Sequence, residues 1–332
     1  MYFRLCRPIL DKDERVFAVL AGRPRDQSWD NVNGELQKLF DITRDAYQLT
    51  SQQISHRRGA FPAVTCGISY GGGQQRVANL VQSRHNQAVL DALVKQAAVR
   101  RVANFGSSAF QLFAPRLYDY YEDSMNTLYS HDPLLRPNFP NNVFAAATFN
   151  LGPRTISYTH LDHLNLPWGW CAITAIGRFD PVCGGHMVLH DLRMVIEFPP
   201  GSTILIPSAI LRHSNTNISA DELRYSFTQY SAGGLFRWIE HGFKPAKYTP
   251  ATATSTSANP CPLRWLFAYR RPLSSTSFMS AASESSPAEQ LHGTESAQQP
   301  EDAKVIHQRM LRRARNQRYQ QKLKVSVQSL TL

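Results

Sequence analysis

Two histidines and one aspartate in the middle of the chain have the residue types and the spacing of metal ligands. His160 and Asp162 are one residue apart, so their side chains project to the same side if this segment is extended. His213 lies 51 residues beyond Asp162. Two imidazoles and one carboxylate leave the opposite coordination positions open, as in non-haem Fe(II) oxygenases. We therefore predict that these three residues bind Fe(II).

An arginine and a serine follow the distal histidine at a spacing that suits an organic anion. Arg224 and Ser226 would share one face of a strand. A planar guanidinium pairs bidentately with a carboxylate, and a serine hydroxyl can donate to the same group. We predict that both residues anchor 2-oxoglutarate, whose other end would bind the iron beside O2. The competing interpretation is a His-rich β-domain whose polar groups satisfy one another.

The segments around these residues read as short strands. After Pro140, apolar runs alternate with Gly, Pro, Asn or Asp, without intervening helices. This succession of short strands predicts a jelly-roll, the double-stranded β-helix, within an α+β protein. The eight predicted strands are Val143–Phe149, Thr155–Thr159, Trp170–Ile176, His186–Leu189, Met194–Phe198, Ser202–Ile206, Arg224–Tyr230 and Leu235–Ile239.

The region before residue 140 reads as mainly helical and would support the jelly-roll and face the substrate. Ser28 or Asp30 can cap a first helix. Apolar residues recur at steps of three and four over Asn86–Asn104 and Ser107–Tyr129, which predicts two further helices. Strands are predicted at Arg15–Leu20 and Phe61–Tyr70. We expect four regions: 1–140, the catalytic core 141–248, a disordered linker 249–303, and a basic helical tail 304–332.

The formal net charge of +11 suggests a polyanionic partner, but the charge is uneven. Residues 1–250 carry +5, whereas the much shorter remainder carries +6, all of it after residue 300. The tail therefore reads as a nuclear localisation signal or a nucleic-acid arm, with a membrane-surface helix and an uninformative tail as the alternatives. No apolar run is long enough to span a membrane. Five scattered cysteines predict neither a disulfide-linked partner nor a zinc pair, which fits a reducing, intracellular and nuclear location.

Three stretches of the sequence resemble a known enzyme family. They begin with Asn-Leu-Gly-Pro-Arg through His-Leu-Asp-His-Leu-Asn, continue with Phe-Pro-Pro-Gly-Ser-Thr-Ile-Leu-Ile-Pro, and end with Arg-Tyr-Ser-Phe-Thr-Gln-Tyr-Ser-Ala. Between about Arg15 and Phe243 the chain resembles the TET/JBP branch of Fe(II)/2-oxoglutarate dioxygenases. The similarity is strongest to TET-like proteins of basidiomycete fungi. It implies the same iron ligands and the same 2-oxoglutarate anchor as the spacing argument above.

The resemblance also implies residues that contact a substrate base. Asn165 holds the place of an asparagine that bonds the target base, and Tyr230 matches a tyrosine that stacks on it. His186 matches a histidine that touches the co-substrate. Ala232 stands where animal TET proteins carry a base-contacting histidine, and their Cys-rich zinc region is absent. The implied reaction oxidises the methyl group of a flipped-out base in DNA, 5-methylcytosine to 5-hydroxymethylcytosine and further.

Two other functions remain open from the sequence. The chain could act on N6-methyladenine or another alkylated base, or it could be a catalytically silent, transposon-associated DNA-binding protein. The sequence does not set the oligomeric state.

Several further residues have weaker functional interpretations. His163 reads as a surface residue, and His186 with His190 has the spacing of a helical zinc pair but strand-like surroundings. Gly71–Gly73 reads as a flexible turn. Arg57 and Arg58 read as phosphate contacts or as solvated side chains.

Overall fold

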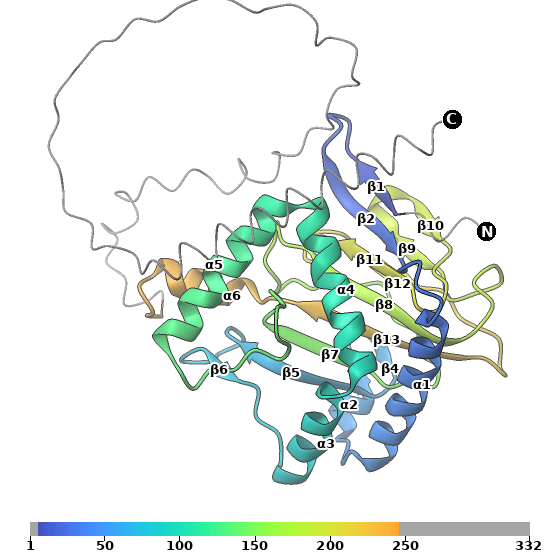
Figure 1. Cartoon of the computed structure of the whole chain (residues 1–332), viewed down its shortest axis with the longest axis horizontal. Helices are drawn as coiled ribbons and strands as arrows, with labels where there is room; N and C mark the ends of the chain where they lie inside the picture. Colours follow the sequence, from blue (N-terminus) through green and yellow to red (C-terminus); the bar gives the residue numbers. More distant parts are fainter. Residues whose placement is uncertain (1–5, 246–332) are drawn as a thin grey trace, which may run out of the picture. The chain divides into compact units, whose positions relative to one another are not determined.

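The largest element of the structure is an eight-stranded antiparallel sheet (Figure 1). The structure is a computed structural model and describes residues 6–245. The strands lie in the order β1-β2-β11-β8-β13-β7-β5-β6. Their bounds are β1 (Arg7–Leu10), β2 (Val16–Gly22), β5 (Ala63–Ser69), β6 (Ala78–Asn79), β7 (Ala146–Asn150), β8 (Cys171–Arg178), β11 (Thr203–Ile206) and β13 (Leu223–Tyr230). The sheet therefore places β13 near its centre, between β8 and β7.

Two smaller sheets complete the β-structure. The first has the order β10-β9-β12, with β9 (Met187–Leu189), β10 (Met194–Ile196) and β12 (His213–Asn215). A 3-10 turn, His190–Leu192, joins β9 to β10. The second is a hairpin of β3 (Ser55–His56) and β4 (Gly59–Ala60). The three-stranded sheet packs over the large sheet through a buried apolar layer to which both contribute, including Ile173, Ala175, Leu189, Ile204 and Leu211.

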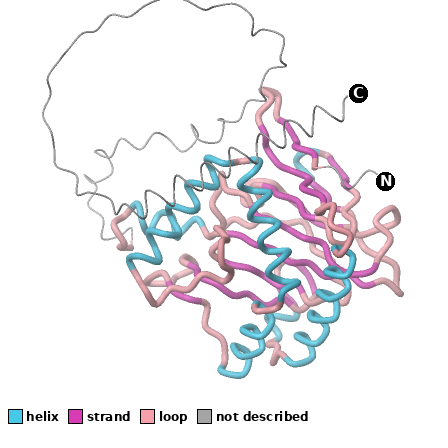
Figure 2. The backbone as a smooth tube through the Cα atoms, in the orientation of Figure 1, coloured by secondary structure: helices cyan, strands magenta, loops and turns pink. Residues whose placement is uncertain are grey.

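Helices cover the opposite face of the large sheet, as Figures 1 and 2 show. The helices are α1 (Trp29–Ala46), α2 (Ser51–Ile54), α3 (Arg84–Val94), α4 (Ala97–Phe113), α5 (Pro115–His131) and α6 (Gly233–Glu240). Helices α1 and α4 lie against the central strands, whereas α6 packs against α5. In α1 the buried residues Val32, Leu36 and Phe40 recur at steps of four, so one stripe of the helix faces the sheet. Phe40 contacts the rings of Phe149 and Tyr225 edge-on.

Alternation along β13 separates two environments. Tyr225 and Phe227 point to the helix side and join its apolar cluster. Successive side chains of a strand point to opposite faces, so Arg224 and Ser226 point to the side of the three-stranded sheet. Both are buried. The space between the two sheets thus receives polar side chains from the centre of the large sheet.

Eight of the ten sequence-predicted strands have counterparts in the structure, but two do not. Leu235–Ile239 is not a strand: it lies in α6, where Leu235 and Phe236 pack against the aromatic core. Thr155–Thr159 is not a strand either: only the flanking Arg154 and His160 make isolated bridges. In addition, β12 was not predicted from the sequence, since His-Ser-Asn carries no apolar alternation.

The helix boundaries also differ from those predicted. The segment Asn86–Asn104 is divided between α3 and α4, and Gln96 precedes α4 with extended backbone dihedrals. The second segment is divided at Ala114, because Pro115 begins α5 at a position where its missing N–H costs no hydrogen bond.

The large sheet crosses the boundary expected at residue 140. Strand β2 pairs with β11, and β5 pairs with β7, so strands from both regions form one sheet. The expected linker and basic tail lie outside the described residues.

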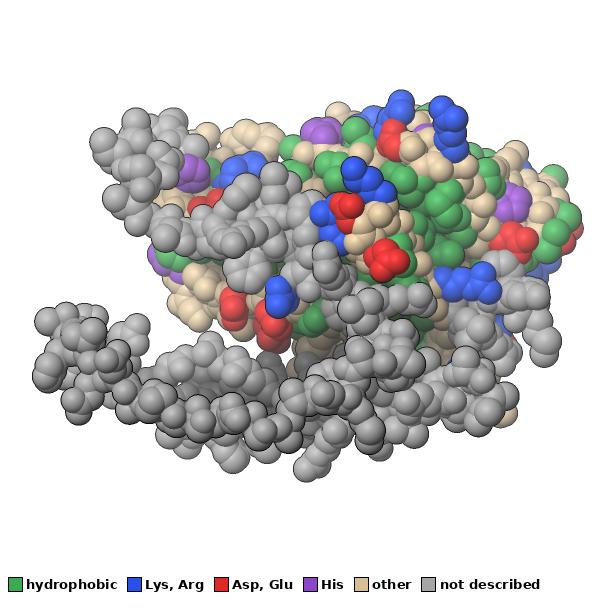
Figure 3. All heavy atoms as spheres, turned by 90° about the horizontal axis from the view of Figure 1, so that it is seen from above, with side chains coloured by type: hydrophobic (Ala, Val, Ile, Leu, Met, Phe, Trp, Pro, Cys, Tyr) green, Lys and Arg blue, Asp and Glu red, His purple; other side chains and the backbone are tan. Residues whose placement is uncertain are grey.

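The surface of the described residues has mixed chemistry. On the face seen in Figure 3, Lys and Arg side chains lie among acidic, hydrophobic and neutral polar ones. No helix within residues 6–245 is long and apolar enough to cross a membrane. Four cysteines are described, and all four are free: Cys6, Cys66, Cys171 and Cys183.

Candidate metal centre

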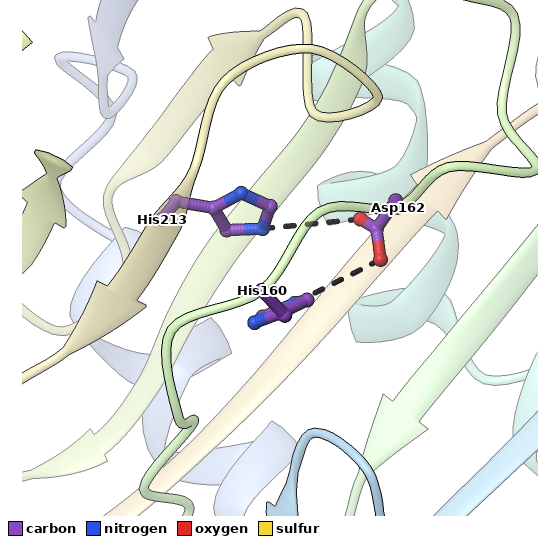
Figure 4. A group of neighbouring side chains, drawn as sticks. All are labelled: His160, Asp162 and His213. Atoms are coloured by element: carbon purple, nitrogen blue, oxygen red, sulfur yellow. Dashed lines mark ion pairs between the residues drawn. The ribbon is translucent and has the colours of Figure 1, made fainter. Parts of the chain in front are cut away.

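The three predicted metal ligands come together between the two sheets (Figure 4). One ligand-capable atom from each of His160, Asp162 and His213 lies within 4.8 Å of the other two. The His160 Nε2 atom is 3.7 Å from Asp162 Oδ1, and His213 Nε2 is 3.8 Å from Asp162 Oδ2. Among residues 6–245 this is the one such group of three. Its donor set of two imidazoles and one carboxylate suits a divalent transition metal with open positions.

Backbone hydrogen bonds hold the two histidines beside each other. The His160 N–H donates to the His213 carbonyl at 3.0 Å, and the His213 N–H donates back to the His160 carbonyl at 3.1 Å. This reciprocal pair is an isolated antiparallel bridge at the edge of β12. Ligands that are distant in the sequence are therefore fixed by main-chain contacts rather than by side-chain packing alone.

Each imidazole is oriented by a carbonyl two residues before it. His160 Nδ1 lies 2.7 Å from the Tyr158 carbonyl oxygen, and His213 Nδ1 lies 2.8 Å from that of Leu211. A carbonyl can only accept, so both Nδ1 atoms carry the proton and both Nε2 atoms keep their lone pair. Burial, followed by the neighbouring His213, lowers the pKa of His160 to about 4. The His160 ring is therefore neutral near pH 7, the state that a metal requires.

The aspartate is placed by a turn that begins at its own carbonyl group. The Asp162 N–H donates to the Ser208 carbonyl at 2.9 Å, and the Asn165 N–H donates to the Asp162 carbonyl at 2.8 Å. Asn165 Nδ2 also donates to Ser208 Oγ at 3.1 Å. The loop after His160 is thus tied to the loop before His213.

Arg224 is a buried cation with unused hydrogen-bonding capacity. Its side chain donates from Nη1 to the Thr155 carbonyl at 3.1 Å, while the buried Nε has no partner. The guanidinium lies 5.8 Å from the centre of the Phe179 ring. Burial lowers the pKa of Arg224 to about 10, which leaves it charged at neutral pH. A buried charge without a counterion is costly, so this group suits an anionic ligand.

Polar atoms around Arg224 are also left unpaired. Asn150 donates from Nδ2 to Ser226 Oγ at 2.8 Å, but its Oδ1 atom is buried without a partner. The hydroxyl of Thr155 is buried and unpaired as well. The Thr155 hydroxyl, Arg224 and Ser226 can each donate to a carboxylate, and the predicted role of Arg224 and Ser226 as the anchor of 2-oxoglutarate stays a prediction.

One asparagine connects the arginine to the metal ligands. Asn215 lies two residues after His213 on the same face of β12, and its Nδ2 donates to the same Thr155 carbonyl that accepts from Arg224. The Thr155 carbonyl therefore links Arg224 to the strand that carries His213.

The residues predicted to contact a base lie at the edge of this centre. Asn165 is half-buried and forms an isolated bridge with Ala232, so the two positions singled out by the resemblance are direct neighbours. Tyr230 ends β13, and burial raises the pKa of its hydroxyl. Whether these residues contact a base stays a prediction.

The remaining histidines have other surroundings. His186 Nδ1 lies 3.1 Å from the Thr216 hydroxyl, and the proposed contact with the co-substrate stays a prediction. His190 Nε2 lies 2.9 Å from Ser214 Oγ and 3.1 Å from Thr159 Oγ1, on the outer side of the ligand-bearing segments. His163 is exposed.

Two arginines near the metal ligands were not assigned to the site from the sequence. Arg57 Nη1 donates to the Leu161 carbonyl at 3.0 Å, and its Nη2 lies 3.7 Å from Asp162 Oδ1. Burial lowers the pKa of Arg58, while Asp162 opposes that change. They precede His160 by about a hundred residues, so only the hairpin geometry reveals their position.

Comparison with known proteins identifies the fold. The structure matches NgTET1, solved in complex with 5mC DNA, with a TM-score of 0.51 and 15% sequence identity over 70% of this chain and 78% of that one. The chain shares the fold of NgTET1. Lower TM-scores are found for a 2OG-Fe(II) oxygenase from Burkholderia pseudomallei (0.33, 17% identity, 63% of this chain and 92% of that one) and for a prolyl-4-hydroxylase from Pseudomonas putida (0.30, 15% identity, 62% and 88%). No family model and no curated protein matches the sequence.

Proposed function

We propose that the chain is an Fe(II)- and 2-oxoglutarate-dependent dioxygenase that oxidises methyl groups on nucleic-acid bases. The observation that carries this proposal is the group of His160, Asp162 and His213, with both Nε2 atoms free for a metal. The fold shared with NgTET1 supports it. We interpret the large and the three-stranded sheets as the two walls of a double-stranded β-helix, with the metal centre between them.

Two sets of residues would bind the metal and the co-substrate. His160, Asp162 and His213 would hold Fe(II), and Arg224 with Ser226 would hold the far carboxylate of 2-oxoglutarate. Bound Fe(II) and 2-oxoglutarate would, together with O2, supply the oxidant that hydroxylates a methyl group, with release of succinate and CO2. The protein orients the imidazoles through Tyr158 and Leu211 and encloses Arg224 away from water.

We propose methylated DNA as the substrate, with 5-methylcytosine as the first candidate base. A methyl group inside a duplex cannot reach a metal between two sheets, so the base must leave the stack. Asn165 would then donate to the base edge and Tyr230 would stack on the ring. NgTET1 was solved with DNA that carries 5-methylcytosine, which supports the choice of substrate. We further propose a nuclear location.

One position favours a second candidate substrate. Ala232 offers no side-chain hydrogen bond beside Asn165, and it is buried. The contact by which a histidine at this position would recognise a cytosine is therefore absent. N6-methyladenine, oxidised by the same mechanism, is therefore the second candidate. A catalytically silent DNA-binding protein is disfavoured because all three metal ligands and Arg224 are present.

One experiment tests both activity and base choice. The purified protein is incubated with Fe(II), 2-oxoglutarate, ascorbate and DNA carrying both 5-methylcytosine and N6-methyladenine, and nucleosides are quantified by mass spectrometry. We expect oxidised nucleosides that are lost in His160→Ala and retained in His163→Ala, a matched control one residue beyond Asp162. DNA that is bound but left unchanged would favour the silent protein. Equal product formation by His160→Ala would refute the metal assignment.

A further inference from the structure

The β3–β4 hairpin brings two consecutive arginines against the metal ligands. Arg57 contacts the loop of Asp162 through the Leu161 carbonyl at 3.0 Å and lies 3.7 Å from the carboxylate. Arg58 follows it at the turn, close enough to Asp162 for that carboxylate to favour the charged form of the Arg58 guanidinium. Burial, and then Arg58, lower the pKa of the adjacent His56, whose ring nitrogens are buried without partners. The hairpin therefore brings positive charge to a partly dehydrated site.

The backbone fixes where this charge lies. The Tyr158 N–H donates to the Arg58 carbonyl at 2.7 Å, which ties the hairpin to the segment that leads to His160. Gly59 has a φ of +155°, and a Cβ placed there would overlap the Ile156 carbonyl and the Phe61 ring. The turn thus runs too close to this segment to shift freely. The two arginines are held beside the metal ligands by main-chain contacts.

The charges in this region do not balance without a ligand. Within residues 6–245, the acidic side chain that contacts or faces Arg57 and Arg58 is Asp162. Arg224 adds a third guanidinium, for which the same residues provide no acidic partner. A divalent cation entering this site meets one carboxylate and an excess of positive charge. At distances of several ångströms and a reduced local dielectric, such repulsion weakens binding substantially.

Resting on the function proposed above, we propose that Arg57 and Arg58 weaken metal binding to the free protein, so that tight binding requires a dianionic co-substrate in the same site. The dianion offsets the arginine charges before or as the metal binds. The coupling is reciprocal, because each ligand must raise the affinity for the other by the same factor. Chelation of the metal by a keto acid also couples the two ligands. However, chelation alone does not predict that removing an arginine improves metal binding.

Titration with Mn(II) tests the proposal without turnover. Free Mn(II) is measured by electron paramagnetic resonance in the absence and presence of N-oxalylglycine, a dianionic analogue of 2-oxoglutarate. We expect the analogue to lower the Mn(II) Kd by roughly 10- to 100-fold. Arg58→Gln should tighten Mn(II) binding without the analogue by about 3- to 10-fold and reduce the coupling. Arg57→Gln should act in the same direction with a smaller effect, because that side chain is 53% exposed.

Two controls separate charge from structure. Arg58→Lys keeps the positive charge, so Mn(II) should bind this variant as weakly as it binds the unsubstituted protein when N-oxalylglycine is absent. Arg100→Gln, an exposed position of α4, should change neither affinity nor coupling. If Arg58→Gln fails to fold by circular dichroism, Arg57→Gln decides the question.

The two proposals fail in distinguishable ways. If His160→Ala abolishes Mn(II) binding but folded Arg57→Gln and Arg58→Gln leave the dianion-free affinity unchanged or weaker, this inference is wrong and the metal centre stands. If His160→Ala leaves Mn(II) binding intact, the proposed function and this inference both fall.

Discussion

Arg224 is the residue whose environment is hardest to explain without a ligand. It lies in the middle of the large sheet and is 2% exposed, and its side chain has one hydrogen-bonding partner among the described residues, the Thr155 carbonyl. Desolvation of an unpaired guanidinium costs several kcal/mol. A buried arginine without a partner therefore destabilises the fold unless a ligand pairs with it. The Thr155 hydroxyl, whose carbonyl accepts from Arg224, is also buried without a partner, and a hydroxyl can donate to an anion. The surroundings of Arg224 therefore favour binding of an anion to its side chain.

We predict that Arg224→Lys weakens binding of the dianion about 30- to 100-fold, because an ammonium keeps the charge but loses the planar fork. The measurement is calorimetric titration of N-oxalylglycine in the presence of Mn(II). Arg178→Lys on the neighbouring strand serves as the control, since Arg178 is exposed. Undiminished affinity in a folded Arg224→Lys protein would exclude Arg224 as the anchor.

Strand β8 connects helix α1 to the strand that carries Arg224. Gly177 pairs with Arg224 across the sheet and has a φ of +127°. Asn33 of α1 bonds both backbone groups of this glycine, at 2.8 Å from Gly177 O and 3.1 Å from Gly177 N. A Cβ at Gly177 would overlap the Leu223 carbonyl. The left-handed backbone and the close approach both require glycine at this position.

We predict that Gly177→Ala lowers the free energy of unfolding by about 2–4 kcal/mol, through strain and a steric overlap with main chain. Gly34→Ala is the matched control. It lies in the interior of α1 with open space at its Cβ position, so alanine there should stabilise by about 0.5–1 kcal/mol. Denaturant unfolding of both variants gives the comparison. A Gly177→Ala protein as stable as the unsubstituted one would contradict the backbone argument.

The sequence predicted the three metal ligands, but it did not predict every element that positions them. His160, Asp162 and His213 could be chosen because few residue types bind iron and their order restricts the options. Arg224 and Ser226 followed from the two-residue period of a strand. The helix α6 was predicted as a strand because Leu235–Ile239 is short and apolar, and such a run does not distinguish the two structures. Strand β12 was missed because main-chain pairing with β9 and His160 defines it.

For the whole molecule, buried tyrosines determine how the fold responds to alkali. Burial raises the pKa of Tyr129 and of Tyr225 to about 12, and Asp41 adds to the effect on Tyr225. Burial also raises the pKa of Tyr120 and Tyr121. In the unfolded chain these hydroxyls ionise near their ordinary pKa of about 10. The folded chain therefore retains protons that the unfolded chain has released.

We predict that this contribution to stability is complete below about pH 10 and is lost progressively as the pH rises, up to about pH 12 for Tyr129 and Tyr225 and at still higher pH for Tyr120 and Tyr121. The sign follows from linkage, because stability falls with pH wherever the native state binds more protons. Thermal unfolding across this range, combined with tyrosinate absorbance, measures both quantities. Tyrosinate absorbance that rises fully near pH 10 in the folded protein would contradict the prediction.

The position of β13 between β8 and β7 has a consequence for the order in which the molecule opens. Arg224 and Ser226 lie on a strand that is hydrogen-bonded on both sides. His213 lies on the three-residue edge strand β12. Local fluctuations that let amide protons exchange with solvent start at edges and short elements. Deuterium should therefore enter the segment around His213 well before it enters β13. Local opening would then release a bound metal while the strand that carries Arg224 and Ser226 stays folded.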